Sequence, residues 1–429
     1  MSDSQRPSRR DFLKGAAATT AGIALAGNLT VARTAHAAGG GPLKVAVIGC
    51  GGRGTGAGSD MLSVADDVKI VAVADAFDYR AKGAANHYRK NFAAKCDLPD
   101  DRIFVGLDAY EKAIACGVDV VILAGPPGFR PSHYAAAIAA GKHVFMEKPC
   151  CTDAPGFRKL MEANKQADEK GLKVGVGLQR RHESGYIGGI EEIRNGKIGD
   201  FVMSRVYWNG DGIWFRDRDP NMTEMYYQVH NWYHFVWLSG DNICEQHVHN
   251  LDVGNWVKGD HPVRANGMGS CLLRYKGRDP KKGMGQIFDN HFVEFTYKDG
   301  TKMYSQCRHI PNTWGGVGET IHGTKGVTGV SGRGPKLQFG PYQQEHFDLL
   351  AAIRKNEKYN EGWHGATSSF TAVLGRMATY SGKEVEWDKA AAQGPDEFPE
   401  KLAWDALPRN VPDAQGNYPI ATPGVYKPY

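Results

Sequence analysis

The clearest chemical signature in the chain is a glycine-rich run that follows a short apolar segment. Val45–Ile48 is apolar, and the next six residues, from Gly49 to Gly54, read Gly-Cys-Gly-Gly-Arg-Gly. In a G-x-G-x-x-G turn the first glycine permits a sharp turn, the second lets the backbone approach a pyrophosphate, and the third lets the next helix pack on the strand. The N-terminus of that helix then faces the phosphates. The spacing therefore predicts a bound dinucleotide.

Asp75 bears on which dinucleotide binds. It follows the expected strand Ile70–Ala74, at the distance of about 20 residues that such a turn requires. A carboxylate there accepts both hydroxyls of the adenosine ribose and repels a 2′-phosphate, which favours NAD over NADP. Arg80 lies nearby in the sequence and could accommodate a phosphate, so NADP stays open. In another interpretation Asp75 only caps the following helix.

Lys148 stands in a second short motif, Glu147-Lys148-Pro149, directly after the apolar run His143–Met146. A lysine at the carboxyl end of a strand would place its ammonium beside the nicotinamide, where a carbinol oxygen gains negative charge as hydride leaves. Glu147 could orient the lysine or bind the cofactor, and Pro149 could fix the chain direction through an unusual peptide geometry. The alternative is a solvated Lys-Pro loop.

Short apolar strands alternate with helical segments over residues 42–180. The expected strands are Val45–Ile48, Ile70–Ala74, Ile103–Val105, Val118–Ala124, His143–Met146 and Lys173–Val176, and the expected helices include Asp108–Cys116, Pro131–Ala140 and Asp153–Lys170. This alternation predicts an α/β fold with a doubly wound parallel sheet, a Rossmann domain. Right-handed crossovers bring the carboxyl ends of the strands to one edge, so the glycine turn, Asp75, Gly125-Pro126-Pro127 and Lys148 should converge there.

Longer strand-like segments follow in residues 181–388, where we expect a second domain. The expected strands are Asp200–Trp208, Pro262–Met268, Gln286–Tyr297 and Thr301–His309, flanked by helices at Ser184–Arg194, Leu251–Lys258, Tyr342–Arg354 and Thr367–Tyr380. This pattern predicts an α+β domain with a large, mostly antiparallel sheet. Residues 389–429 are Pro-rich, and we expect an extended tail that packs on the surface or on a partner subunit, with a disordered tail as the alternative.

The N-terminal 37 residues resemble a twin-arginine export signal. Ser8-Arg9-Arg10-Asp11-Phe12-Leu13-Lys14 precedes a mildly apolar segment and the cleavage-like site Ala35-His36-Ala37. Residues 15–31 are too short and too rich in Gly, Ala and Thr for a retained membrane helix. The resemblance implies a periplasmic or exported protein that folds with its cofactor before export.

Composition excludes several classes of function. The chain has 429 residues, of which 41% are hydrophobic and 23% charged, and its net charge of +5 forms no basic run. Neither nucleic acid nor an anionic membrane is therefore an expected partner, and we expect small-molecule ligands. The eight cysteines show no C-x-x-C pair, so they indicate buried apolar positions and neither a zinc site nor a disulfide framework.

Taken together, these motifs resemble the Gfo/Idh/MocA oxidoreductase family over nearly the whole mature chain. The resemblance rests on the glycine turn, Gly125-Pro126-Pro127, His133, Glu147-Lys148-Pro149 and the segment from Glu245 to Asp252. It implies an NAD(P)-binding Rossmann domain followed by a domain whose open sheet supplies a sugar or polyol pocket and an oligomer interface. The expected cofactor-binding residues are Gly49, Gly51, Gly52, Arg53, Gly54, Asp75, Pro126, Pro127, His133, Glu147, Lys148 and Gln179.

The segment from Glu245 to Asp252 is similar to the family's acid-x-x-x-His motif. Its imidazole, His249, could accept the hydroxyl proton while hydride moves to the nicotinamide C4, with Glu245 holding the ring. The family more often has Asp at the Glu245 position, which puts that orienting role in doubt. His249 could instead be a buried structural histidine. A metal site built from His230, His234, His247, His249 and Glu245 is a further alternative, but the leading interpretation has no metal.

Aromatic residues crowd the region between positions 207 and 237, where a carbohydrate could bind. Aromatic faces pack on the C–H faces of a sugar ring, and neighbouring polar groups bind its hydroxyls. The expected substrate-binding residues are Arg181, Trp208, Trp232 and Asp252. Such aromatics could equally be core or interface residues.

The leading functional hypothesis is an NAD(P)-dependent oxidoreductase acting on CH–OH groups of a sugar, a sugar derivative or a cyclitol, with Lys148 and His249 assisting. Because free NAD is scarce outside the cytoplasm, a redox-neutral enzyme with tightly bound cofactor is an alternative, either a sugar–sugar oxidoreductase or an oxidation-assisted glycosidase. A non-catalytic sugar-binding or NAD-binding protein is another. The resemblance also implies a homo-oligomer, a dimer or a tetramer.

Overall fold

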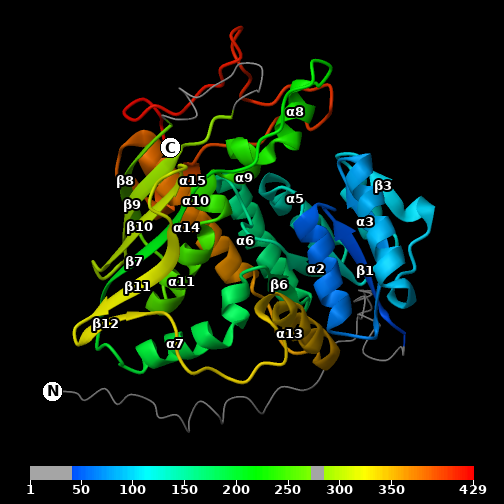
Figure 1. Cartoon of the computed structure of the whole chain (residues 1–429), viewed down its shortest axis with the longest axis horizontal. Coiled ribbons are helices and arrows are strands. Elements are labelled where there is room, and N and C mark those ends of the chain that lie inside the picture. The colour runs from blue at the N-terminus through cyan, green and yellow to red at the C-terminus, as the bar shows by residue number, and fades with distance from the viewer. Residues whose placement is uncertain (1–40, 272–284) are drawn as a thin grey trace, which may run out of the picture. The chain divides into compact units, whose positions relative to one another are not determined.

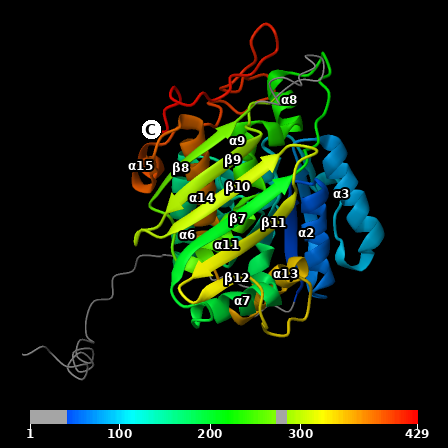
Figure 2. The same cartoon turned by 60° about the vertical axis from the view of Figure 1, so that its left-hand side comes forward.

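The computed structural model describes residues 41–271 and 285–429. The expected signal segment, residues 1–37, lies outside the described residues. Figures 1 and 2 show two sheets with helices packed around them.

Six parallel strands form the first sheet, in the order β3-β2-β1-β4-β5-β6. Their bounds are β1 Leu43–Ile48, β2 Val68–Asp75, β3 Ile103–Val105, β4 Val120–Leu123, β5 His143–Met146 and β6 Val174–Val176. Alternate residues of β1 enter two different cores, Val45 and Val47 on one side and Ala46 and Ile48 on the other, so helices cover both faces. This order and these bounds confirm the predicted Rossmann sheet.

Helices connect these strands and end close to the expected positions. They are α2 Gly52–Ser63, α3 Asp78–Asn91, α4 Ala109–Ala115, α5 Arg130–Ala139 and α6 Ala154–Glu169, with short 3-10 turns at Ala93–Lys95, Asp100–Arg102, Pro127–Phe129 and Gln179–His182. Asp153 caps α6, because its carboxylate accepts from the Gly156 N–H at 2.8 Å. Prolines in the first turns of α5 and α6 also favour these starting points.

Seven strands form the second sheet, in the order β12-β11-β7-β10-β9-β8-β13. Their bounds are β7 Phe201–Gly210, β8 Arg264–Ser270, β9 Asn290–Thr296, β10 Lys302–His309, β11 Gly316–Gly323, β12 Gly326–Gly329 and β13 Val385–Glu386. Every pair is antiparallel except β7 with β10, which confirms the mostly antiparallel expectation. The β11–β12 hairpin and β13 were not predicted. Figure 2 shows this sheet face-on.

Several, but not all, of the helices in the second half lie against one face of this sheet. The helices are α7 Ser184–Arg194, α8 Glu224–His230, α9 Val236–Ser239, α10 Asn242–Glu245, α11 Val248–Lys258, α13 Pro341–Lys355, α14 Gly362–Ser381 and α15 Trp387–Gln393, with a 3-10 turn at Trp232–His234. Phe370 of α14 stacks on Phe157 of α6 at 4.3 Å, and both share a core with Phe295 of β9. One continuous core therefore joins the two sheets.

Helix α13 departs from the expected arrangement. It was expected to flank the second sheet, but Leu349 and Leu350 pack in the same core as Val45 and Phe145 of the first sheet. Gly175 of β6 makes room, because a Cβ there would lie 3.3 Å from Leu349. The chain thus returns to the first sheet after leaving it near residue 180, and the predicted domain boundaries remain a prediction.

The C-terminal tail beyond α15 has no helix or strand in residues 394–429 and packs on the protein. Tyr418 is only 4% exposed and contacts Phe235 at a ring distance of 5.0 Å. Among the described residues, no helix has the length and apolar character needed to cross a membrane, and no disulfide bond joins the cysteines.

Candidate active site

The glycine turn has the geometry that a dinucleotide requires. Gly49 has a φ of 93°, in the left-handed region that favours glycine. A Cβ on Gly54 would lie 1.7 Å from the Gly49 carbonyl oxygen, so no other residue fits there without movement. Helix α2 begins at Gly52, and its N-cap, Gly51, has no side chain to occupy the free N–H groups. These residues fit a bound pyrophosphate.

Asp75, the last residue of β2, is hydrogen-bonded to the backbone of the glycine turn. Its carboxylate accepts from the backbone N–H of Cys50 at 2.7 Å and from that of Phe77 at 2.9 Å. Burial raises the pKa of the Asp75 carboxyl above its usual value, against these hydrogen bonds. Because α3 begins at Asp78 and Phe77 is its N-cap, Asp75 does not cap that helix. Its carboxylate faces the cavity described next.

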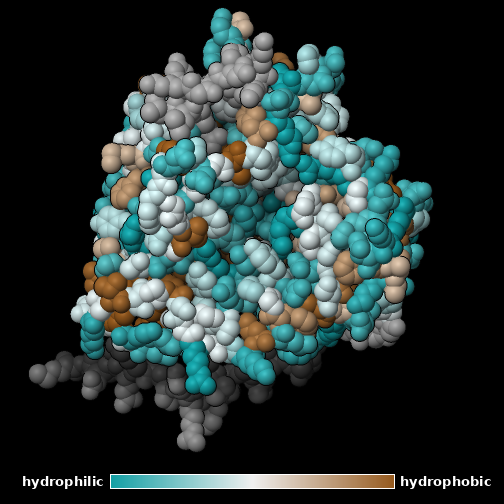
Figure 3. Space-filling view, in the orientation of Figure 1, coloured by the Kyte–Doolittle hydropathy of each residue, from teal (hydrophilic) through white to brown (hydrophobic). Residues whose placement is uncertain are grey.

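A cavity of about 280 Å³ runs along the carboxyl ends of β1, β2, β3 and β4. Residues from the first half of the chain line most of it, namely Gly49, Gly51, Gly52, Arg53, Gly54, Asp75, Phe77, Arg80, Gly106, Tyr110, Gly125, Pro126, Phe129 and His133. Trp214, Arg216, Val229 and Trp232 from the second half complete the lining. Trp232, expected at the substrate, thus lies with the glycine turn. Figure 3, which has the orientation of Figure 1, shows a hydrophilic hollow near the middle of the visible face.

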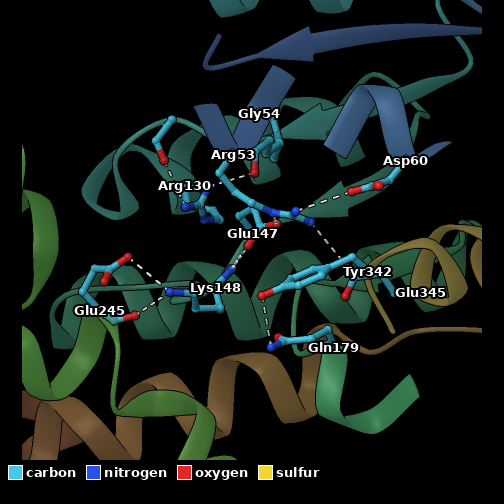
Figure 4. Close-up of polar contacts among 12 residues, drawn as sticks. Arg53, Gly54, Asp60, Arg130, Glu147, Lys148, Gln179, Glu245, Tyr342 and Glu345 are labelled. Carbon is cyan, nitrogen blue, oxygen red and sulfur yellow. Dashed lines mark hydrogen bonds and ion pairs between the residues drawn. The ribbon is translucent and has the colours of Figure 1, made fainter. Parts of the chain in front are cut away.

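Lys148 lies between the two halves of the chain, two residues after the end of β5. Its ammonium donates to the carbonyl oxygen of Glu245 at 2.7 Å and to the Glu245 carboxylate at 3.2 Å (Figure 4). Both side chains are largely buried, with 16% and 14% exposed. The Lys148–Pro149 peptide bond is cis, the unusual geometry that the motif suggested. Glu245 thus fixes the position of the lysine ammonium.

Arg53 is the centre of a second charged cluster at the same edge. It donates to the carboxylates of Glu147 at 2.5 Å and Glu345 at 3.2 Å, and it pairs with Asp60 at 3.5 Å. Its guanidinium also lies 4.6 Å from the ring centre of Tyr342 (Figure 4). Glu345 and Tyr342 belong to α13, and no local sequence signal placed them at the site.

His249 lies near the start of α11, 7% exposed, with the ring of Trp208 stacked 6.1 Å away. Burial, followed by the positive charges of Lys148 and Arg180, lowers the pKa of His249 well below 6.5, so the imidazole is neutral at neutral pH. Its Nδ1 has no hydrogen-bond partner among the described residues. Within that part of the chain no hydrogen bond joins it to Glu245, which contacts Lys148 instead of the imidazole.

Arg181 and Asp252, both expected at the substrate, pair with each other. The guanidinium donates to both carboxylate oxygens at 2.9 and 2.8 Å, and Ser368 donates to the same carboxylate at 2.7 Å. Gln179 donates to the Tyr342 hydroxyl at 3.4 Å. These contacts place Arg181, Asp252 and Gln179 in the junction between the two sheets, and their binding roles remain predictions.

Arg130 is a residue that the sequence interpretation missed. It is 2% exposed and donates to the carbonyl oxygens of Leu123, Gly125 and Pro149 at 2.8, 3.0 and 3.1 Å. It therefore ties the loop after β4 to the loop after β5. The only available signal was its position beside Pro131 at a predicted helix start.

His133 lies in the cavity wall after β4, whereas Pro127 is not among the residues that line the cavity. The His133 imidazole stacks on Tyr110 at 4.0 Å, and burial followed by the charge of Arg130 lowers its pKa to about 3. Pro127 starts the short 3-10 turn that leads into α5. The His133 ring is therefore uncharged at neutral pH and forms part of the cavity wall.

The alternative metal site has no support in the described ranges, 41–271 and 285–429, where no group of three metal-binding side chains comes together. His247 contacts Ser305 at 2.8 Å, and the ring of His230 lies against Phe77 at 5.6 Å. The histidines therefore serve separate parts of the structure.

Comparisons with known families agree with this geometry. Residues 43–178 match the GFO_IDH_MocA model, described as an oxidoreductase family with an NAD-binding Rossmann fold, and residues 6–26 match the twin-arginine translocation signal. Residues 43–178 are therefore similar to the NAD-binding Rossmann domain of the Gfo/Idh/MocA oxidoreductases. The signal directs the protein to export through the twin-arginine pathway.

Individual relatives extend this likeness. An inositol 2-dehydrogenase of Acidothermus cellulolyticus is 31% identical over 215 residues, which are 50% of this chain and 53% of that protein. The match thus spans about half the length of that relative. A scyllo-inositol dehydrogenase of Lactobacillus casei, solved with NAD(H) and scyllo-inositol, superposes with a TM-score of 0.60 at 17% identity, covering 81% of this chain and 99% of that one. An aldose-aldose oxidoreductase of Caulobacter crescentus superposes with a TM-score of 0.59 at 16% sequence identity, covering 80% of this chain and 99% of that one.

Proposed function

We propose that this protein is an exported NAD-dependent oxidoreductase that transfers hydride between a secondary hydroxyl of a cyclitol or sugar and the nicotinamide C4. The observation that carries the proposal is the position of Lys148, held by Glu245 at the same sheet edge as the glycine turn and Asp75. In a doubly wound sheet, ligands bind along this edge. The similarity to inositol 2-dehydrogenases supports a cyclitol as the first substrate to test.

In this proposal, one group of residues binds the cofactor and another assists the transfer of hydride and proton. Bound NAD supplies the hydride acceptor. The glycine turn and the start of α2 would hold its pyrophosphate, and Asp75 its adenosine ribose. Lys148, a cation fixed by the Glu245 carbonyl, stabilises the negative charge that develops on the carbinol oxygen. His249, neutral because of its burial, accepts the hydroxyl proton.

The direct test mixes mature protein with NAD and single candidates from a panel that begins with myo-inositol and includes scyllo-inositol and aldoses. Absorbance of reduced nicotinamide is followed over time. Reduction with one panel member supports the proposal, and reduction with none, at nucleotide concentrations that saturate binding, would count against it. NADP is run in parallel, because the Asp75 carboxylate predicts that NAD is preferred.

A second candidate follows from the twin-arginine signal. An exported enzyme meets little free NAD, so we propose as an alternative that the nucleotide stays bound and is reduced and reoxidised within each turnover. The structural likeness to an aldose-aldose oxidoreductase shows the fold alone, and it is the export signal that favours this version. Native mass spectrometry after export discriminates, since a nucleotide lost on dialysis would contradict it.

The open face of the second sheet supports a homo-oligomer, a dimer or a tetramer, as part of the same proposal. Met268, Phe292 and Val327 are between 43% and 74% exposed on the strands of this sheet. Apolar side chains that gather on one face mark a contact surface. Light scattering of the purified protein gives the number of subunits.

A further inference from the structure

The cavity beside Asp75 is closed by residues from the other half of the chain. Trp214, Arg216 and Trp232, called here the adenosine wall, line the same cavity as Asp75 and Gly106. Asp75 ends β2, and Gly106 follows β3. The carboxyl ends of these two strands lie on the side of the sheet where a Rossmann domain holds the adenosine half of a dinucleotide.

The adenosine wall is held in shape by buried polar groups. Asn231, fully buried, accepts from the Arg216 N–H at 2.9 Å and donates to the Arg216 carbonyl at 3.1 Å. The Arg216 guanidinium donates to the His230 carbonyl at 2.6 Å and lies 4.0 Å from the ring centre of Trp214. His234 contacts the Trp214 carbonyl at 2.7 Å. The indole and guanidinium planes are therefore in place before any ligand binds.

The C-terminal tail supports this wall from behind. Trp404 packs against Tyr226 at 5.4 Å and against Phe77, which lines the cavity, at 5.8 Å. The Tyr418 hydroxyl contacts the Glu224 carboxylate at 2.5 Å. Glu224 and Tyr226 belong to α8, which ends at His230 just before Asn231. Movement of the wall would therefore disturb the packing of the tail.

We propose that the adenosine wall binds the adenine of NAD and that the C-terminal tail, through Trp404, slows its release. Purines stack on indole rings and on guanidinium planes, and a positive guanidinium suits the electron-rich purine face. A preorganised wall does not have to be ordered during binding, so its contacts contribute fully to affinity. This inference rests on the proposed function and adds the residues that decide how long the cofactor stays.

ADP-ribose, which lacks the nicotinamide, tests the wall without any hydride chemistry. Its affinity is measured by calorimetry for the nucleotide-free protein and for Trp214→Ala and Arg216→Ala. Loss of a stacking partner predicts affinity about 10- to 100-fold weaker. Trp214 is 37% exposed, so it is not part of the fully buried core. Trp314→Ala is the matched control, an indole 57% exposed outside this cavity, and its affinity is expected to match that of the unaltered protein.

Trp404→Ala tests the tail separately, by the rate at which bound NAD is displaced by excess ADP-ribose. We expect release at least about 5-fold faster than in the unaltered protein, with the wall residues intact. Thermal melting without ligand verifies that each variant is folded. If the unaltered protein binds ADP-ribose and the wall variants bind it equally well, this inference is wrong while the proposed function stands. If ADP-ribose does not bind at all, the proposed function itself fails.

Discussion

Replacing Lys148 with methionine removes one positive charge and keeps most of the side-chain volume. The ammonium makes two contacts, to the Glu245 carbonyl at 2.7 Å and to its carboxylate at 3.2 Å, and the side chain is 16% exposed. A cation held in one place within a largely buried site needs no reorganisation when charge develops on the substrate oxygen. Removing one such group typically costs about 3–4 kcal/mol in the transition state, which is about 10²–10³ in rate.

The expected result is a kcat lower by about 10²–10³-fold with the affinity for NAD changed by less than about 3-fold, because Lys148 is not among the residues that line the nucleotide cavity. The assay measures reduced nicotinamide with the substrate found in the panel, and fluorescence quenching reports NAD affinity. Lys302→Met is the matched control. It also breaks a Lys–Glu pair, with Glu294 at 2.7 Å, but on β10. A Lys148→Met enzyme with full kcat would refute the assigned role.

Three further predictions concern cofactor choice, backbone space and pH. Asp75→Asn should weaken NAD binding while raising the affinity for NADP relative to NAD, measured by calorimetry with both nucleotides; an unchanged ratio would contradict the ribose role. Gly54→Ala should abolish nucleotide binding, because its Cβ would lie 1.7 Å from the Gly49 carbonyl, and normal binding would show that the turn can open. Although burial opposes it, the carboxylates of Glu361 and Asp348 raise the pKa of His182 to about 10. The charged imidazole therefore stabilises the fold fully below pH 6.5, and this contribution falls as the pH rises towards 10. His182→Gln should lower the free energy of unfolding most near pH 6, by on the order of a few kcal/mol, and only slightly at pH 10. Chemical denaturation at both pH values measures this difference. An equal loss at both pH values would refute it.

Local patterns predicted the first sheet because its signals lie close together in the sequence. Strand β1, the glycine turn and Asp75 occupy one βαβ unit, where hydrophobic runs and glycine spacing identify the elements. The β11–β12 hairpin gave no such signal. Its two strands contain glycine at 316, 318, 323, 326 and 329, and glycine is unfavourable in strands, so neighbouring strands and not local preference hold it.

Contacts between distant residues could not be predicted in the same way. Glu345 lies 292 positions from Arg53, and Glu245 lies 97 positions from Lys148. Glu245 was expected to hold His249, because the two share a local motif, but the fold turns its side chain to the lysine. Trp232 was assigned to the substrate from aromatic clustering alone; it lines the same cavity as the glycine turn, and its role in binding remains a prediction.

The central claim, that a carbinol hydride moves to a nucleotide held at the edge beside Lys148, is tested most directly by isotope transfer. The NAD-loaded protein is incubated with cyclitols and aldoses carrying deuterium on their carbinol carbons, and the nucleotide is recovered after a single turnover. Mass spectrometry should find deuterium at the nicotinamide C4 with one member of the panel, and no label with Lys148→Met over the same time. Unlabelled nucleotide from the unaltered protein, with a substrate that it demonstrably converts, would contradict the account.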